Sequence, residues 1–482
     1  MTGRNVLIIM ADEHAREGLG CYGHPAIQTP NLDKLAAQGT RFTQAYTPSP
    51  VCVPARAAFA TGRHVSQTRC WTNAQPFHGQ IPGWGQRLID AGHEVVSVGK
   101  LHYRSTADDN GFSREIIPLH CHNGVGWVQG LLRREHHIFE TAHFAEEIGP
   151  GDDPYSDYDR EVCAKAIEWL QHEGAVRRDK PWVLFVSFLR PHYPLTCPRD
   201  YYDLYPLDRI ELPRFAGREI EYGNPVMAAF RAYYNYDDYF DERSRIVARA
   251  SYYGLCSFVD ALVGRLLTAL EDSGRTGDTT ILYTSDHGEL IGEHGLWTKM
   301  SMHEQSAGIP LIMAGAGASP GICETPASLI DVYPTVLETA GLSLAAEDEA
   351  LPGRSLFDLA QTSDPERAVF SEFHDGGAIT GFFMLRLGRW KYIHYPGFAP
   401  QLYDLESDPR EEHDLGLSDR HAEVRRKCLE VMHAQLGDPE AINTQAFTDQ
   451  ARRIEELGGA EAILTMDRFD FTPVDSQVEA GR

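Results

Sequence analysis

The stretch Val6–His14 reads VLIIMADEH, a continuous apolar run that ends in Asp, Glu and His. A short run of this kind predicts a strand buried on both faces, as found in parallel sheets. Runs of the same character recur at Val95–Gly99, Trp182–Phe188 and Thr279–Thr284. Helical patterns separate these runs. The chain is therefore predicted to be an α/β protein with a large, mixed, mostly parallel sheet sandwiched by helices.

Three successive units are predicted along the chain. The first, residues 1–365, holds the alternating strands and helices and is the expected catalytic unit. It includes helices at 29–38, 159–172, 244–272 and 329–340, a strand at 310–314, and long loops at 104–158 and 196–243. Residues 366–438 predict a smaller antiparallel α+β unit, with strands at 368–373, 382–387, 390–395 and 401–405 and a helix at 420–436. Residues 439–482 are acidic and weakly periodic, so we expect a tail that contacts a neighbouring subunit.

Bulk composition excludes several classes of protein. The 482 residues contain 42% hydrophobic and 23% charged side chains, which is ordinary for a globular protein. The formal net charge of −25 disfavours nucleic acid and anionic membranes as partners. Nine scattered cysteines without a CxxC pair argue against a disulfide scaffold and a structural zinc site. No run reaches the roughly 20 apolar residues of a membrane span, and no signal peptide is evident, so we expect a cytoplasmic protein.

Cys52 stands in an unusual local order, Pro50-Val-Cys-Val-Pro-Ala-Arg56. A helix is predicted to begin just after it, at Ala55, and to run to Thr61. A helix N-terminus favours anions, and Arg56 adds planar donors suited to tetrahedral oxyanions. The alternative is a buried cysteine in a proline-containing turn, which is the usual position of a lone cysteine.

The predicted strands end in chemically reactive residues. Ligands bind at the carboxyl ends of the strands in doubly wound sheets, so these residues are expected to meet at one edge. They are Asp12, Glu13 and His14; Lys100 and His102; Arg190 and His192; and Asp286 and His287. Asp12, Asp286 and His287 suit a divalent ion such as Ca²⁺, Mg²⁺ or Mn²⁺, and the imidazole favours Mn²⁺ or another transition metal. An alternative role for Asp286 is to cap a helix or a turn. The alternative for Lys299, which follows this block, is a solvated surface lysine.

Taken together, these motifs resemble the sulfatase family of the alkaline phosphatase-like superfamily. The Cys52-x-Pro54-x-Arg56 order resembles the signature whose cysteine is oxidised to formylglycine. Further blocks follow in the family's order over roughly residues 4–415. They are Thr61-Gly-Arg63, Gly99-Lys-Leu-His102, Pro191-His-Tyr-Pro194, Ser285-Asp-His-Gly288, Lys299, Asp331-Val-Tyr-Pro-Thr335 and Leu402-Tyr-Asp-Leu405 with Asp408-Pro409.

Three positions depart from the common sulfatase pattern. Ala55 replaces a frequent serine, which leaves the cysteine, proline and arginine of the signature intact. Glu13 stands where many sulfatases carry a second metal-binding aspartate, so it is a metal ligand by position only. His287 stands where many carry asparagine, and the Asp-His block is more similar to the choline sulfatase and phosphonate monoester hydrolase branches. The Lys100-x-His102 pair favours a sulfatase over the phosphonate branch.

The resemblance implies hydrolysis of a small-molecule sulfate monoester through a formylglycine hydrate at Cys52 that also binds the metal. A formylglycine-generating enzyme is then a partner in maturation. Arg56 and Lys100 would stabilise negative charge, His102 would be the base for the second hydroxyl, and His192 and Lys299 would neutralise or protonate the leaving oxygen. The metal ligands would be Asp12, Asp286, His287 and the modified Cys52.

Alternative functions remain on sequence grounds. A phosphonate monoester or phosphodiester hydrolase could use the same scaffold. A non-catalytic, metal-dependent binding protein would need Cys52 to stay unmodified, and a Ser- or Thr-dependent phosphatase or mutase would need a hydroxyl residue there. Tyr233-Tyr-Asn-Tyr236 and Trp127 either pack within loops or favour an aryl or cationic alcohol. We expect a homo-oligomer, a dimer or a tetramer.

Overall fold

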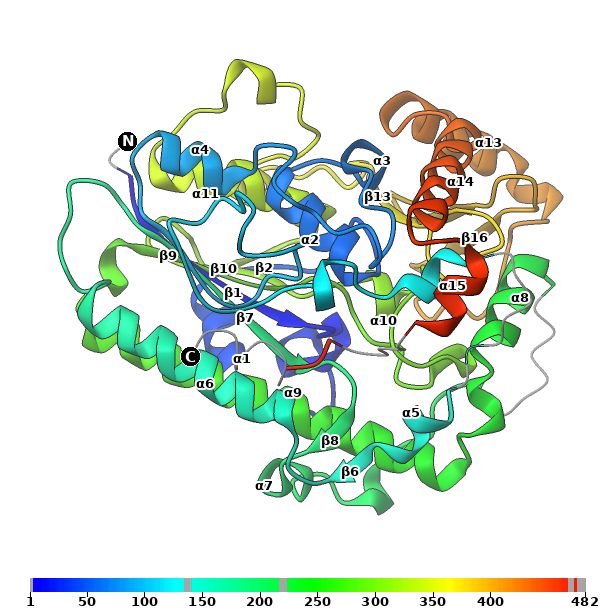
Figure 1. Cartoon of the computed structure of the whole chain (residues 1–482), viewed down its shortest axis with the longest axis horizontal. Coiled ribbons are helices and arrows are strands. Elements are labelled where there is room, and N and C mark those ends of the chain that lie inside the picture. The colour runs from blue at the N-terminus through cyan, green and yellow to red at the C-terminus, as the bar shows by residue number, and fades with distance from the viewer. Residues whose placement is uncertain (1–2, 134–138, 140, 216–222, 467–471, 475–482) are drawn as a thin grey trace.

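A single mixed sheet of eight strands forms the centre of the molecule (Figure 1). The computed structural model describes residues 3–133, 139, 141–215, 223–466 and 472–474. The strand order is β11-β2-β10-β9-β1-β7-β4-β5, and only β10 runs antiparallel to its neighbours. The strands are β1 (Asn5–Asp12), β2 (Thr40–Phe42), β4 (Val95–Lys100), β5 (Arg114–Leu119), β7 (Val183–Pro191), β9 (Thr279–Ser285), β10 (Leu311–Gly315) and β11 (Gly321–Cys323). The predicted mostly parallel sheet is confirmed.

Helices cover both faces of this sheet, as the continuous apolar strands require (Figure 1). Alternate side chains of β1 enter two separate cores. Val6, Ile8 and Met10 pack in the core formed with α2 (Cys52–Thr61), α4 (Trp84–Asp90) and α11 (Val332–Ala340). Leu7, Ile9 and Ala11 pack in the core formed with α1 (Pro30–Gln38), α6 (Pro154–His172) and α9 (Glu242–Asp272).

Helix α9 has 31 residues and bears on the expectation that no segment is apolar enough to span a membrane. Among the described residues, it is long and apolar enough to do so by length and composition alone, with a mean hydropathy of 1.4 over an 18-residue window. However, 72% of its apolar window is buried inside the protein. The helix packs on β7 and beside α6, which is the position of a core helix. Its apolar character is therefore explained by the sheet that it covers.

A second, antiparallel sheet of four strands follows, in the order β13-β14-β15-β16. Its strands are β13 (Val369–Phe373), β14 (Phe382–Leu387), β15 (Trp390–His394) and β16 (Gln401–Asp404), and α13 (Ala422–Gln435) packs on it. The stretch from Pro439 is more ordered than expected, because it forms α14 (Pro439–Glu456) and α15 (Ala460–Thr465). Residues 467–471 and 475–482 of the expected tail lie outside the described residues. The three-unit division and the subunit contact stay predictions.

The two long predicted loops contain short elements. Helix α8, for example, begins with an Asn224 side chain that accepts hydrogen bonds from the first turn, followed by a proline. Residues 134–138, 140 and 216–222 of these loops lie outside the described residues. The remaining elements of the chain are β3 (Ala45–Tyr46), α3 (Val65–Thr68), α5 (Ala142–Glu146), β6 (Ile148–Pro150), β8 (Leu195–Cys197), α7 (Arg199–Tyr202), α8 (Pro225–Tyr234), α10 (Glu304–Ala307), β12 (Ala327–Ser328) and α12 (Leu356–Gln361).

Candidate active site

The carboxyl ends of four neighbouring strands, β9, β1, β7 and β4, meet at one edge of the large sheet. Asp12 ends β1, Lys100 ends β4, and Asp286 directly follows β9. Cys52 faces these residues from α2. The helix predicted to begin at Ala55 begins at Cys52 itself, so the thiol belongs to its first turn. The edge predicted from the sequence therefore exists and includes Cys52.

Four side chains each direct one atom that can ligate a metal toward a common point. His287 Nε2 lies 3.2 Å from Cys52 Sγ, 3.7 Å from Asp12 Oδ1 and 3.6 Å from Asp286 Oδ1. Cys52 Sγ lies 3.8 Å from Asp12 Oδ1. The four residues are buried, and their donor atoms all lie within 4.8 Å of one another. These separations suit ligands arranged around one divalent ion with bonds of about 2.0–2.5 Å.

The other carboxylate oxygens of the two aspartates face cations. Arg56 Nε donates to Asp286 Oδ2 at 2.8 Å, and its Nη2 donates to Asp12 Oδ2 at 3.2 Å. Lys100 Nζ also donates to Asp12 Oδ2. Each aspartate thus presents Oδ1 to the common point and holds Oδ2 on a buried cation. This division fixes the orientation of both carboxylates before any ion arrives.

Electrostatics keep Asp12 ready to bind a cation. Burial alone would raise the pKa of Asp12, but Lys100, with His192 and Arg56, holds that pKa well below its usual value. Burial, in contrast, lowers the pKa of His287, so its imidazole is neutral at pH 7 and has a free lone pair. An ionised carboxylate and a neutral imidazole are the protonation states that a metal ion requires.

Glu13 belongs to a neighbouring group rather than to the four-residue set. Its Oε2 lies 3.1 Å from Lys299 Nζ and 3.3 Å from His192 Nε2, and these two nitrogens also contact each other. Burial, together with the nearby Glu289 carboxyl, raises the pKa of Glu13 well above its usual value. Glu13 therefore anchors Lys299 and His192. With Asp12 and His192, Glu13 forms a second group of side chains whose oxygen and nitrogen atoms could hold a metal ion.

His102 approaches the site from the loop after β4. Burial and the nearby Lys100 lower the pKa of His102 well below its ordinary value, so the ring is neutral and can accept a proton. Its Nε2 lies 3.1 Å from Thr472 Oγ1, although the two residues are 370 positions apart in the sequence. The backbone of His102 is left-handed, with φ 59°. The side chains of His102 and Cys52 line the same cavity.

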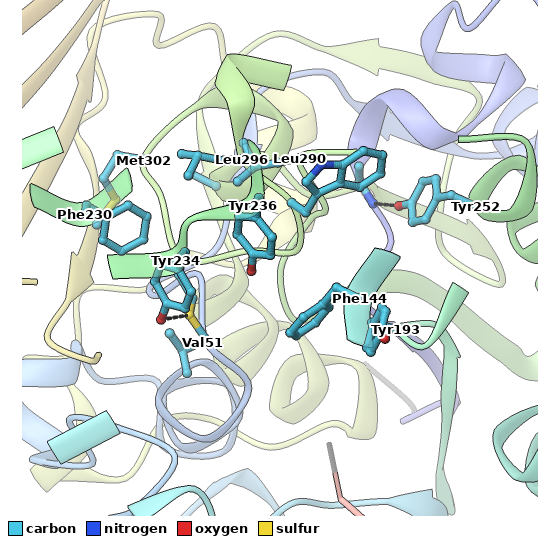
Figure 2. Close-up of a cluster of buried hydrophobic side chains, with 14 of the residues drawn as sticks. Val51, Phe144, Tyr193, Phe230, Tyr234, Tyr236, Tyr252, Leu290, Leu296 and Met302 are labelled. Atoms are coloured by element: carbon cyan, nitrogen blue, oxygen red, sulfur yellow. Dashed lines mark hydrogen bonds between the residues drawn. The ribbon is translucent and has the colours of Figure 1, made fainter. Parts of the chain in front are cut away.

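A cavity of about 60 Å³ opens onto Cys52, Lys100, His102, His192 and Lys299. Its outer wall is aromatic. Four of its rings follow one another in an arc, in the order Tyr193, Phe144, Tyr236 and Tyr234 (Figure 2). The ring centroids lie 4.1 Å apart for Tyr193 and Phe144, 5.7 Å apart for Phe144 and Tyr236, and 5.8 Å apart for Tyr236 and Tyr234. Trp127 also lines this cavity, whereas no carboxylate does among the described residues. The cavity is thus cationic at its base and aromatic at its mouth.

Some candidates lie elsewhere, and some contacts had no sequence signal. Arg63, which belongs to one of the blocks of the family resemblance, pairs with Asp348 at 3.9 Å and does not line the cavity. Asn73, whose Oδ1 accepts the Val53 N–H at 3.0 Å, does line it. Asn73 and Thr472 belong to no recognisable motif and come from segments far from the strand ends. Sequence spacing could not have identified them.

Comparisons with known proteins agree with this site. Residues 4–342 match the Sulfatase family, and residues 292–437 match the family described as N-sulphoglucosamine sulphohydrolase, C-terminal. The chain is 32% identical to choline-sulfatase of Rhizobium meliloti (strain 1021), over 94% of this chain and 90% of that one. It is 30% identical to human arylsulfatase K, over 90% and 82% of the two chains. The solved phosphonate monoester hydrolase of Agrobacterium radiobacter superposes with a TM-score of 0.74, at 25% identity, over 92% and 96% of the two chains.

The family match extends over more than half of the chain. The chain belongs to the sulfatase family and is a hydrolase of the alkaline phosphatase-like fold. Its buried Asp12, Cys52, Asp286 and His287 form a candidate metal site.

Proposed function

We propose that this member of the sulfatase family hydrolyses a sulfate monoester to an alcohol and sulfate, with formylglycine made from Cys52 as the nucleophile. One observation carries the proposal: Cys52 Sγ stands among the donor atoms of Asp12, Asp286 and His287, at the base of a cation-lined cavity. An atom in this position can contact both a divalent ion and the sulfur of a bound ester. A formylglycine-generating enzyme would supply the conversion.

The unmodified thiol is poorly suited to the task. Burial, with the nearby Asp12, raises the pKa of the Cys52 thiol to about 12, so very little thiolate exists at neutral pH. The aldehyde hydrate supplies one hydroxyl to attack sulfur and a second whose loss of a proton expels sulfate. A divalent ion held by Asp12, Asp286 and His287 would supply positive charge that lowers the pKa of the attacking hydroxyl.

The remaining roles follow from charge and protonation. Arg56 and Lys100 hold Asp12 and Asp286 in orientation and balance the negative charge that builds up during transfer. His102, neutral and lining the same cavity as Cys52, accepts the proton of the second hydroxyl. His192 and Lys299, held together by Glu13, face the cavity and neutralise or protonate the departing oxygen.

Mass spectrometry of the tryptic peptide of residues 42–56 tests the nucleophile. We expect the Cys52 side chain to be converted to the lighter aldehyde in active protein, and activity to scale with the converted fraction. A Cys52→Ser variant, which cannot give the cysteine-derived aldehyde by the same route, serves as the matched control. Full activity from a preparation in which residue 52 is entirely thiol would disprove the mechanism.

The alcohol part is proposed to be compact and aromatic. The arc from Tyr193 to Tyr234 and Trp127 offers ring faces to the leaving group, and the absence of a lining carboxylate among the described residues favours a neutral group. We expect a higher kcat/KM for an aryl sulfate than for an alkyl sulfate of similar size. Choline sulfate belongs in the same panel, because aromatic faces also bind quaternary ammonium groups. A preference for a sulfated sugar over all three would contradict this assignment.

A phosphonate monoester hydrolase is the second candidate function. The similarity to the solved enzyme from Agrobacterium radiobacter favours it. A phosphonate monoester and a sulfate monoester each carry one negative charge, so the cations of the cavity accept either. Comparing kcat/KM for an aryl sulfate and an aryl phosphonate on the same converted preparation decides between them. We expect the sulfate to be the better substrate.

A further inference from the structure

A second cluster of metal-ligating side chains lies outside the catalytic cavity. It consists of His294, in the short turn Glu293–Gly295, His303, just before α10, and Glu411, in the loop after β16. Each residue offers one ligand atom, and the three atoms lie within 4.8 Å of one another. All three residues are buried. None of them contributes to the donor group around Cys52 or lines the catalytic cavity.

His303 leaves one ring nitrogen available for coordination. His303 Nδ1 lies 3.5 Å from Glu411 Oε2 and makes no hydrogen bond within the described part of the chain. The His303 side chain is only 3% exposed, so water does not readily satisfy this nitrogen. The imidazoles of His294 and His303 stack 3.7 Å apart and 5° from parallel. His294 also stacks on Phe215, with ring centroids 5.6 Å apart, so coordination of one ion by both imidazoles would require one ring to change its orientation.

Charge in the cluster is already balanced without protonated histidines. Lys391 Nζ lies 2.7 Å from both Glu411 Oε1 and Glu304 Oε1, and Arg16 pairs with Glu304. Two carboxylates therefore meet two cations. Lys391 contacts Oε1 of Glu411, whereas Oε2 accepts the Glu304 N–H at 2.7 Å and lies 3.5 Å from His303 Nδ1.

An open cavity of about 210 Å³ adjoins the cluster and gives access to it. His294, His303 and Glu411 line it together with the acidic side chains of Glu412 and Asp414. Acidic walls attract cations, and the open volume leaves room for water to complete a coordination shell. The cluster thus has a path for entry as well as ligands.

We propose that His294, His303 and Glu411 bind a divalent transition-metal ion of the Zn²⁺ type, at a site separate from the one at Cys52. Two imidazoles and one carboxylate are typical ligands of Zn²⁺, and water would fill the fourth position. By contrast, the catalytic group offers two carboxylates and one imidazole beside Cys52, which suit a harder ion.

The position of the site gives it a structural role. His294 and His303 lie on either side of Lys299 in one segment of the chain, and Lys299 lines the catalytic cavity. Glu411 belongs to the region of the small antiparallel sheet. An ion bound by all three residues would fasten the segment 294–303 to that region and restrict the motion of Lys299. The metal is therefore a positioning element and does not contact the substrate.

Metal stoichiometry tests the proposal on the full-length protein. Metal-free wild type and His303→Gln are titrated with Zn²⁺, and with Co²⁺ for its visible absorption, and bound metal is counted after desalting. We expect His303→Gln to bind one equivalent fewer than wild type and to lose the increase in Tm that Zn²⁺ gives wild type. His120→Gln is the matched control. It removes a histidine with 6% side-chain exposure that lies 3.0 Å from Glu115, outside both donor groups.

Two further variants keep the test decisive if His303→Gln does not fold. His294→Gln is expected to lose the same equivalent. Asp286→Asn, which disables the catalytic group, is expected to retain one equivalent of Zn²⁺. Folding of each variant is checked by circular dichroism. Equal stoichiometry in wild type and a folded His303→Gln or His294→Gln overturns the proposal, and so does the absence of bound Zn²⁺ in folded Asp286→Asn. Neither result depends on sulfatase activity or on conversion of Cys52.

Discussion

Replacing Lys100 with methionine should show how the site prepares Asp12. Methionine has a similar length and no charge, so the change removes the ammonium with little change in volume. Lys100 is buried, and its Nζ donates to Asp12 Oδ2. Arg56 Nη2 still donates to the same oxygen at 3.2 Å in the variant. Asp12 therefore loses one of its two cationic partners and keeps its position.

The expected loss is that of one preorganised charged contact. Such a contact contributes about 10²–10³ in rate, so kcat/KM for an aryl sulfate should fall by roughly that factor. The pH dependence should change as well. Because Lys100 helps to hold the pKa of Asp12 well below its usual value, its removal lets burial raise that pKa. The acid limb of the pH–rate profile should move to higher pH.

The pH dependence of stability should shift in the same direction as the acid limb of the rate profile. A carboxylate with a lowered pKa in the folded protein stabilises the fold at neutral pH, and this contribution is lost as the pH falls through the folded-state pKa. In Lys100→Met the loss should begin at a higher pH than in wild type, as measured by Tm between neutral and acidic pH.

The control is Arg275→Met. This variant removes another buried cation, 3.0 Å from Asp278, near the amino end of β9 and away from the cavity. It should lower Tm without moving the acid limb. Conversion of Cys52 is measured in each preparation, so that a failure of maturation is not mistaken for a loss of catalysis. Wild-type kcat/KM and an unshifted acid limb in fully converted Lys100→Met would refute the reasoning.

Three further predictions concern the neighbouring residues. His102→Gln should lower kcat/KM by about 10²–10⁴ and remove a limb of the pH–rate profile that, given the lowered pKa of His102, lies on the acid side of the ordinary histidine value. Glu13→Gln should keep the metal at the catalytic group and lose about tenfold or less in rate, because glutamine preserves one hydrogen bond to Lys299. Elemental analysis measures the bound metal, with Asp286→Asn as the comparison variant that should lose it. Phe144→Ala should lower kcat/KM for an aryl sulfate roughly 2- to 12-fold more than for methyl sulfate, since ring contacts contribute about 0.5–1.5 kcal/mol. Equal losses on both substrates would show that the aromatic wall does not bind the alcohol part of the substrate.

The strand ends explain why so much of the site could be predicted from the sequence. Parallel strands bring their carboxyl ends to one edge, so residues that follow separate apolar runs meet without any need to know the loops. Asp12, Lys100 and Asp286 were predicted in this way, and the structure brings them together around Cys52. The family resemblance added an order for these blocks that sequence spacing alone does not supply.

The C-terminal helices show why other parts could not be predicted. The apolar face of helix α14 is interrupted, because its buried residues include the polar Asp449 and Gln450. Asp449 accepts hydrogen bonds from Arg69 and Trp71, and these polar contacts add to the packing of Ile442 and Ile454 in holding the helix in place. Hydrophobic periodicity has no signal for such a helix. Thr472 lies beyond it, and its contact with His102 depends on the whole path of the chain.

The charges at the site also account for an anion site in a chain with a net charge of −25. Three cations, Arg56 behind the cavity and Lys100 and Lys299 lining it, each contact an acidic side chain of the protein. These contacts orient Asp12, Asp286 and Glu13 and offset part of the positive charge. A divalent ion between the two aspartates would add positive charge at the position where the sulfuryl group is proposed to bind. The proposed metal would therefore contribute to substrate binding as well as to activation of the proposed nucleophile.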